Sequence, residues 1–148
     1  MPIPQLLPDG LLPEGVHECT IEEVIERFGR FQESDRRPML GKELAAYFDE
    51  LRNVGIGKYL IVDGSFVTGK SRPSDVDLLL VLKDDVDLTA PVPPFRYNAR
   101  SKRYVRKHFH FDFFFGFDGD STATEYLALF REVKYQPGLV KGYLKVVL

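Results

Sequence analysis

The spacing of apolar residues predicts three amphipathic helices. In residues 38–54 apolar side chains recur every three or four positions, a proline lies in the first turn and a glycine follows the last residue. Residues 122–133 have the same period. They open with Thr122 and, three positions later, Glu125, which is the pattern of a capping box. Thr20 begins a similar pattern, which predicts a short helix over residues 20–28.

Four further stretches have the composition of β-strands. They are rich in β-branched and aromatic residues or alternate between apolar and polar side chains, and they cover residues 58–62, 75–82, 108–117 and 142–148. Together with the helices they predict a single α+β domain, in which a mixed sheet of about four or five strands is backed by the two longer helices.

Residues 1–19 are unsuited to a helix or a central strand because they contain four prolines and two glycines. Isoleucine and leucine are interspersed among them, so we expect an extended arm that packs on the domain or on a neighbouring molecule. Residues 1–148 are thus interpreted as one domain with a proline-rich N-terminal arm. Three prolines in residues 88–98 predict a semi-rigid surface connection.

The composition is that of an ordinary globular protein and limits the classes of function. Hydrophobic residues make up 44% of the chain and the net charge is −2, so there is no general attraction to nucleic acid. Cys19 is the only cysteine, which excludes an internal disulfide and a zinc site built from several cysteines. No apolar stretch reaches the roughly 18 residues of a spanning helix, and no leader-like segment is recognised. We expect a cytoplasmic protein without membrane contact, either monomeric or a small oligomer such as a homodimer.

The loop between two predicted strands carries residues suited to a metal and a phosphate. Side chains alternate along a strand, so Asp75 and Asp77 project from the same face. Adjacent carboxylates raise each other's pKa unless a cation compensates them, and Mg²⁺ favours carboxylates together with phosphate oxygens. Gly64 and Ser65 form a turn before them, where glycine lets the backbone approach a phosphate and serine offers N–H and O–H donors.

A Gly-Ser pair, nine intervening residues and Asp-x-Asp at the start of an apolar strand resembles the signature of the polymerase-beta-like nucleotidyltransferase superfamily. The resemblance implies a nucleotidyltransferase-like fold in which the turn holds a nucleoside triphosphate, with ATP the expected donor. It also implies that the paired aspartates bind two Mg²⁺ or Mn²⁺ ions, together with a third carboxylate from a later strand. The nucleotide contacts expected on this basis are Gly64, Ser65, Lys70 and Ser74.

Asp112 is the candidate for the third carboxylate. It alternates with phenylalanines in an apolar stretch, where a carboxylate is unfavourable unless it is paired or bound to a metal. His108 and His110 are predicted to share its strand face, and they either contact the site or are inert. Asp118 and Asp120 are alternatives, but they lie beside glycines in what is predicted to be a turn.

A basic run without an intervening acid precedes this stretch. It is interpreted either as a solvated face or as a surface that contacts the triphosphate or a polyanionic acceptor such as RNA. Its members are Arg96, Arg100, Lys102, Arg103, Arg106 and Lys107.

The expected activity is transfer of a nucleoside monophosphate from the Mg²⁺-bound triphosphate to a hydroxyl on a protein or RNA. Asp75, Asp77 and Asp112 would bind two metal ions, which assist the attacking hydroxyl and the leaving pyrophosphate. Minimal members of the superfamily resemble antitoxins, which nucleotidylate or bind a partner toxin protein. The alternative is therefore a protein-binding module that keeps the fold with little or no catalysis, and the apolar arm is the observation that motivates it.

Overall fold

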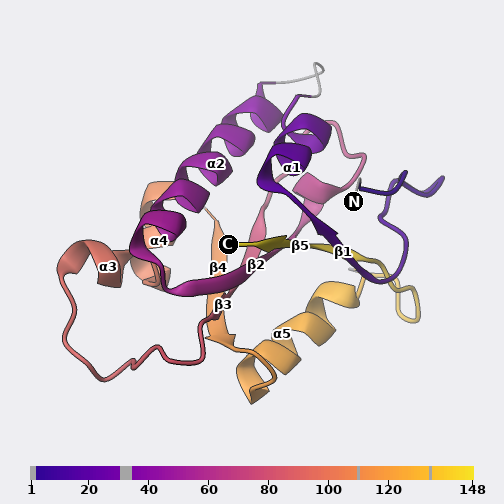
Figure 1. The fold of residues 1–148 in the computed structure, drawn as a ribbon. Helices are drawn as coiled ribbons and strands as arrows, with labels where there is room; N and C mark the ends of the chain where they lie inside the picture. Colours follow the sequence, from indigo (N-terminus) through magenta and orange to yellow (C-terminus); the bar gives the residue numbers. More distant parts are fainter. Residues whose placement is uncertain (1–2, 31–34, 110, 134) are drawn as a thin grey trace.

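The computed structural model describes residues 3–30, 35–109, 111–133 and 135–148. In this part of the chain five strands form one sheet in the order β1-β5-β2-β3-β4 (Figure 1). The pairs β1/β5 and β3/β4 are parallel, whereas β5/β2 and β2/β3 are antiparallel. The prediction of a mixed sheet in an α+β fold is confirmed. The strands are β1 Val16–Cys19, β2 Gly57–Asp63, β3 Asp77–Leu82, β4 Asp112–Phe117 and β5 Tyr143–Val147.

Helices cover both faces of this sheet, with α1, α2 and α4 on one face and α5 on the other (Figure 1). Along β3, Leu78 and Leu80 pack into the core under α1 and α2, whereas Leu79 and Val81 pack into a second core under α5. Burial on both faces accounts for the continuous apolar run in this strand. The helices are α1 Ile21–Phe28, α2 Arg36–Val54, α3 Pro94–Asn98, α4 Lys102–Phe109 and α5 Ser121–Arg131, with a short 3₁₀ helix η1 Ser65–Val67.

The ends of the first two helices confirm the sequence predictions. Thr20 and Glu23 form a reciprocal capping box at the start of α1. Gly55 follows α2 with φ of 72°, a left-handed conformation that favours glycine. The capping box predicted at Thr122 is wrong, because α5 begins earlier and is capped by Asp120.

The predicted strand over residues 108–117 is wrong in its first part. Residues 102–109 form α4, in which Val105 is buried and Phe109 packs on Tyr47 with ring centres 5.3 Å apart. Val105 and Phe109 are four positions apart, so a helix buries both against α2, and this outweighs the alternation that suggested a strand. His108 therefore lies on a helix and not on the face of Asp112, while His110 lies outside the described residues.

The N-terminal arm packs on its own domain. Ile3 and Leu12 are buried in the core under α1 and α2, and Arg27 donates hydrogen bonds to the carbonyls of Ile3 and Pro4. The arm ends in β1, an edge strand paired with β5. Its prolines precede this strand, and none removes a donor from the sheet.

The surface connection predicted over residues 88–98 contains a short helix. Residues 94–98 form α3, with proline at the first turn where a missing N–H is tolerated. None of the helices in the described ranges is long and apolar enough to cross a membrane.

Candidate metal centre

Three aspartates lie in a row across three neighbouring strands. Asp63 at the end of β2 is the register partner of Asp77 at the start of β3. Asp77 is in turn the register partner of Asp112 at the start of β4. Register partners project from the same face, so all three carboxylates lie on the α5 side of the sheet, beyond the apolar residues that α5 covers.

Asp75, which precedes β3, completes a cluster with two of these residues. One carboxylate oxygen from each of Asp75, Asp77 and Asp112 lies within 4.8 Å of the others. The expectation from strand alternation was that Asp75 and Asp77 share a face, and the structure places both beside Asp112. The cluster thus contains the three residues that the sequence singled out as metal ligands.

The cluster is electrostatically unfavourable without a cation. The pKa of Asp77 is raised to about 7, first by burial and then by the negative charges of Asp75, Asp63 and Asp112. A carboxyl group with this pKa is only partly ionised at neutral pH. Either a proton or a bound cation therefore compensates the repulsion.

The donor set fits Mg²⁺ or Mn²⁺. Oxygen ligands of one octahedral Mg²⁺ lie roughly 3 Å apart when adjacent and roughly 4 Å apart when opposite. The oxygens of the three carboxylates are within 4.8 Å of one another, so small side-chain movements bring them onto a shared cation. Hard carboxylate oxygens, without a cysteine or histidine among them, are the ligands that these ions prefer.

Gly64 allows the turn after β2 to lie directly against the metal-binding segment. Its φ is 92°, and a Cβ atom at this position would lie 2.9 Å from the carbonyl oxygen of Asp75 and 3.0 Å from the amide nitrogen of Asp77. Both the conformation and the close backbone approach require glycine here.

Ser65 connects this turn to Asp75 through a closed set of hydrogen bonds. Its N–H and its hydroxyl both donate to Asp75 Oδ1, at 2.9 and 2.5 Å. The hydroxyl oxygen accepts from the N–H groups of Ser74 and Asp75, at 2.9 and 3.2 Å. The donors that the sequence assigned to a phosphate thus serve a metal-ligand candidate in this structure. Binding of a phosphate by Ser65 requires Asp75 to release these donors.

Two arginines at the start of α2 hold the loop between β2 and β3, and sequence reasoning missed them. Arg37 is fully buried and donates to the carbonyls of Phe66, Thr68 and Lys70. Arg36 donates to the carbonyls of Pro73 and Ser74 at 3.0 and 3.1 Å. The backbone beside Lys70 and Ser74 is therefore fixed, while the side chain of Lys70 is exposed at the surface.

A buried ion pair adjoins the carboxylate row and was also missed. Asp63 is only 3% exposed and bonds to Lys141, whose ammonium also donates to the carbonyl of Phe130 at 2.7 Å. Burial raises the pKa of Asp63 to about 6, although Lys141 opposes this. Asp63 could have been recognised as a carboxylate that ends an apolar strand next to Gly64, but no local signal indicates Lys141.

The two alternatives for the third carboxylate lie elsewhere. Asp118 accepts hydrogen bonds from Tyr59 at 2.8 Å and Lys58 at 3.2 Å, beyond the other end of β4. Asp120 caps α5 by accepting from the N–H groups of Phe117 and Ala123. Both carboxylates therefore have structural partners away from the cluster.

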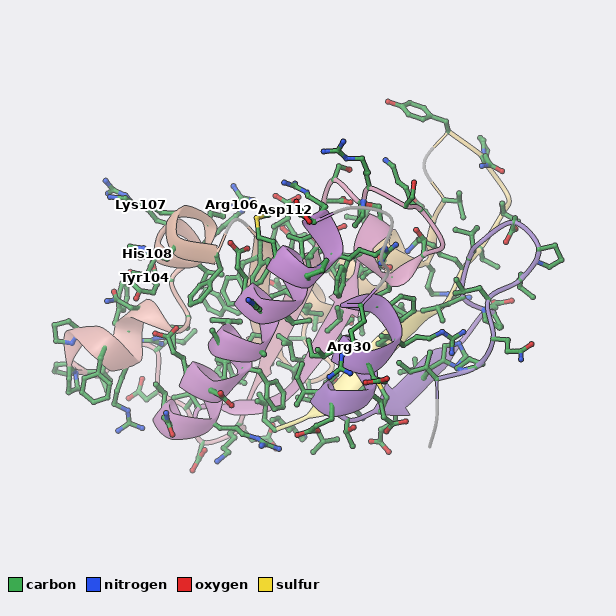
Figure 2. The ribbon with its side chains drawn as sticks, turned by 90° about the horizontal axis from the view of Figure 1, so that it is seen from above. Arg30, Tyr104, Arg106, Lys107, His108 and Asp112 are labelled. Atoms are coloured by element: carbon green, nitrogen blue, oxygen red, sulfur yellow. The ribbon has the colours of Figure 1, made fainter. Side chains whose placement is uncertain are left out.

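The basic run divides between the two ends of the sheet. Lys102 and Arg106 lie over the ring of Phe114, at 4.7 and 5.9 Å from its centre. Phe114 is two residues after Asp112 on the same face of β4, and Figure 2 labels both Arg106 and Asp112 in the view from above. Arg96 and Arg100 line a cavity near the start of β2 instead.

Comparison with known proteins adds no assigned activity to this geometry. A family model described as "Family of unknown function (DUF6932)" matches residues 4–147. Neither the curated proteins nor the solved structures contain a match.

Proposed function

Because the chain belongs to this family of unknown function, we propose its activity from the site alone: a Mg²⁺-dependent nucleotidyltransferase that uses a nucleoside triphosphate, with ATP the expected donor. The observation that carries the proposal is the cluster of Asp75, Asp77 and Asp112 beside the Gly64-Ser65 turn. This conjunction gives physical support to the resemblance found in the sequence.

The reaction moves a nucleoside monophosphate to a hydroxyl group. The acceptor oxygen forms a bond to the α-phosphorus, the bond from that phosphorus to the bridging oxygen breaks, and pyrophosphate leaves. Asp75, Asp77 and Asp112 would hold Mg²⁺ or Mn²⁺, which when bound would supply positive charge to the phosphate and to the acceptor hydroxyl. Asp112 is the most exposed of the three carboxylates and accepts the proton of the acceptor hydroxyl.

Binding of the triphosphate is coupled to Asp75 in this proposal. When Asp75 turns to a cation, the Ser65 hydroxyl and N–H lose their acceptor and are free to donate to a phosphate oxygen. Lys70 and Ser74, in the same fixed loop, add further donors. Lys102 and Arg106 contribute positive charge from the opposite side of Asp112.

Transfer of label from α-labelled ATP in the presence of Mg²⁺ tests the proposal. Asp77→Asn removes one charge from the cluster and should abolish transfer to an added RNA or protein pool. Asp49→Asn is the matched control, because Asp49 is an exposed aspartate on α2. Transfer that continues unchanged in Asp77→Asn would refute the assignment.

The exposed face of α4 favours a polyanionic acceptor such as RNA. Lys102, Arg103, Arg106 and Lys107 are all exposed, and the helix has no acidic residue in its first turn. Phosphate contacts release counterions, so RNA binding should weaken steeply as the salt concentration rises. RNA affinity that is independent of salt would contradict this choice of acceptor.

The antitoxin-like alternative loses part of the observation that motivated it, the apolar N-terminal arm. Ile3 and Leu12 of the arm are buried in this domain, so they do not form a free docking segment. A partner toxin and a homodimer both stay predictions. Co-purification with a partner that persists after replacement of all three cluster aspartates would favour the binding module over the enzyme.

A further inference from the structure

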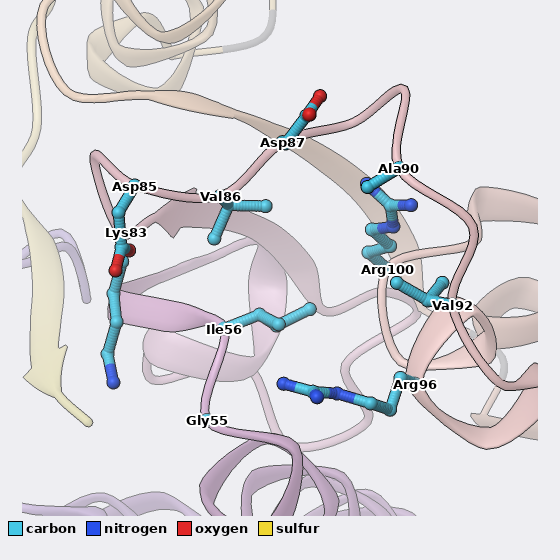
Figure 3. A pocket seen from close by; sticks show the side chains of 10 residues that line it. All are labelled: Gly55, Ile56, Lys83, Asp85, Val86, Asp87, Ala90, Val92, Arg96 and Arg100. Carbon is cyan, nitrogen blue, oxygen red and sulfur yellow. The ribbon is translucent and has the colours of Figure 1, made fainter.

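A cavity of about 280 Å³ lies at the end of the sheet opposite the carboxylates. It is bounded by the segment that joins α2 to β2 and by the chain that follows β3 (Figure 3). Helix α3 and Arg100, which follows it, close the remaining side. The carboxylate row occupies the other ends of the same strands, so the two sites are separated by the length of β2 and β3. The walls of the cavity include Ile56, Val86, Val92, Lys83, Arg96 and Arg100.

Arg100 is the unusual residue of this cavity. Its side chain lines the cavity and the residue is only 7% exposed, yet its guanidinium has no hydrogen-bond acceptor or ion-pair partner among the described residues. Its nearest aromatic contact is the ring of Tyr97, whose centre is 5.5 Å away. A guanidinium has five N–H donors, and those of Arg100 have only the cavity and its solvent to bond to.

Arg37 shows how a guanidinium with a structural role is hydrogen-bonded in this fold. Arg37 is buried more deeply than Arg100, and its nitrogens donate to the carbonyls of Phe28, Phe66, Thr68 and Lys70. Those carbonyls belong to the elements that Arg37 joins. Arg100 joins no such elements, and its donors are directed at the cavity.

The backbone next to Arg100 is held firmly. Ala99 is buried, and the buried hydroxyl of Tyr47 donates to its carbonyl oxygen at 2.6 Å. The N–H of Arg100 donates to the carbonyl of Tyr97 at 3.1 Å. The main chain that carries the Arg100 side chain is therefore fixed, which lowers part of the entropy lost when a ligand binds.

The other charged groups at the cavity leave Arg100 without a carboxylate. Asp87 accepts from the N–H and hydroxyl of Thr89, at 2.9 and 2.7 Å, and points away from the cavity in Figure 3. Asp85 lies on the far wall beside Lys83 (Figure 3). Arg96 donates one hydrogen bond to the carbonyl of Val54 at 3.0 Å, and its guanidinium extends toward Ile56 across the cavity (Figure 3).

We propose that this cavity binds a small ligand with one phosphate or carboxylate head group and a short apolar body. The head group accepts hydrogen bonds from Arg100, with Arg96 adding positive charge, because a planar guanidinium matches an oxyanion in a bidentate manner. The body packs on Ile56, Val86 and Val92. The volume is just below the range typical of small-molecule sites, which favours a ligand smaller than a nucleoside triphosphate. The site is independent of the proposed transferase centre.

Calorimetric titration of the full chain tests this ligand class. The probes are hexyl phosphate and hexanoate, with hexylammonium as the probe of opposite charge. The wild-type chain should bind at least one of the two anions and not the cation, and Arg100→Met should weaken that binding about tenfold or more. Arg30→Met is the matched control, because Arg30 is exposed after α1, where it pairs with Glu26. It belongs neither to the cavity nor to the α4 surface, so this variant should leave the affinity unchanged. Preference for one anion identifies the head group.

Thermal unfolding supplies a readout that a structural role of Arg100 would not produce. Without ligand, Arg100→Met should melt no lower than the wild type, because the Arg100 guanidinium makes no hydrogen bond or ion pair with the described residues that the substitution could remove. Ala90→Glu gives a second test that keeps Arg100, since both side chains line the cavity. The introduced carboxylate should pair with Arg100, raise the melting temperature and prevent binding of the anionic probes. Unchanged affinity in Arg100→Met, or a wild-type chain that binds neither anion, would overturn the proposal.

Discussion

Asp77 on β3 is the register partner of Asp112 on β4, so their carboxylates leave the same face of the sheet side by side. Asp63 continues the row on the other side of Asp77. Three adjacent strands therefore place three carboxyl groups side by side at one edge of the α5 face, where the strands begin or end. The stability of this edge depends on whether a proton or a cation is bound.

The first prediction concerns the pH dependence of stability without metal. The pKa of Asp77 is about 7 in the folded chain, above the ordinary value near 4, so the folded state binds more protons than the unfolded state between about pH 4 and pH 7. The free energy of unfolding should therefore fall as the pH rises through this window. Asp77→Asn should reduce this loss, of which the part due to Asp63 remains, and should be more stable than the wild type by about 1–2 kcal/mol at about pH 8, after allowance for solvent screening.

Urea denaturation at about pH 4 and pH 8 measures how the free energy of unfolding changes with pH in the wild type and in Asp77→Asn. The control Asp49→Asn should follow the wild-type pH dependence, because Asp49 is exposed on α2. A stability difference between Asp77→Asn and the wild type that does not grow from pH 4 to pH 8 would contradict the raised pKa of Asp77.

The second prediction is that Mg²⁺ stabilises the chain more at high pH than at low pH. Protons and the cation compete for the same carboxylates, so the effect should be larger at about pH 8 than at about pH 5.5. For a dissociation constant of about 1 mM, about 10 mM Mg²⁺ adds about 1.4 kcal/mol. Differential scanning fluorimetry checks this, and Asp77→Asn should lose most of the increase. An equal increase in a chain without the three aspartates would place the ion elsewhere.

Local rules were sufficient to predict much of this edge. Alternation along one strand placed Asp75 and Asp77 on one face, and the apolar setting of Asp112 marked it as a carboxylate that needs a partner. Gly64 was recognised from its position in a turn, and its φ of 92° agrees with that role. Each of these inferences uses residues within a few positions of one another.

The features that were missed depend on contacts between distant segments. Lys141 reaches Asp63 across 78 positions, and Arg37 reaches the loop after β2 across about thirty. The apolar spacing of Val105 and Phe109 fits a helix that packs on α2, but the neighbouring phenylalanines also fit a strand. Only the tertiary packing decides between these two periods.

The third prediction tests the buried ion pair. Lys141→Met leaves Asp63 without its partner and removes a donor from the carbonyl of Phe130, so the chain should lose about 3 kcal/mol at neutral pH. The loss should be smaller at about pH 5, because Asp63, with a pKa of about 6, is then largely neutral. Lys42→Met on the exposed face of α2 is the control and should have little effect.

A double-mutant cycle separates the charge from the packing. Asp63→Asn combined with Lys141→Met should recover part of the stability lost in Lys141→Met alone, because the unpaired charge is gone. Additive losses from the two substitutions would show that the pair has no energetic coupling.

The fourth prediction concerns the turn that touches the carboxylates. Gly64→Ala places a methyl group 2.9 Å from the carbonyl oxygen of Asp75 and 3.0 Å from the amide nitrogen of Asp77, so the backbone of both segments must shift. We expect a loss of about 2–4 kcal/mol, the sum of an unfavourable φ and a backbone clash. Gly119→Ala is the matched control, since Gly119 has φ of 76° but nothing within 4 Å of the added Cβ atom, and it should lose only about 1 kcal/mol. The displaced segment carries two of the cluster aspartates, so Gly64→Ala should also reduce the Mg²⁺-dependent rise in melting temperature, whereas Gly119→Ala should retain it. Equal losses of stability in the two variants would mean that the close approach at Gly64 does not hold the carboxylates in place.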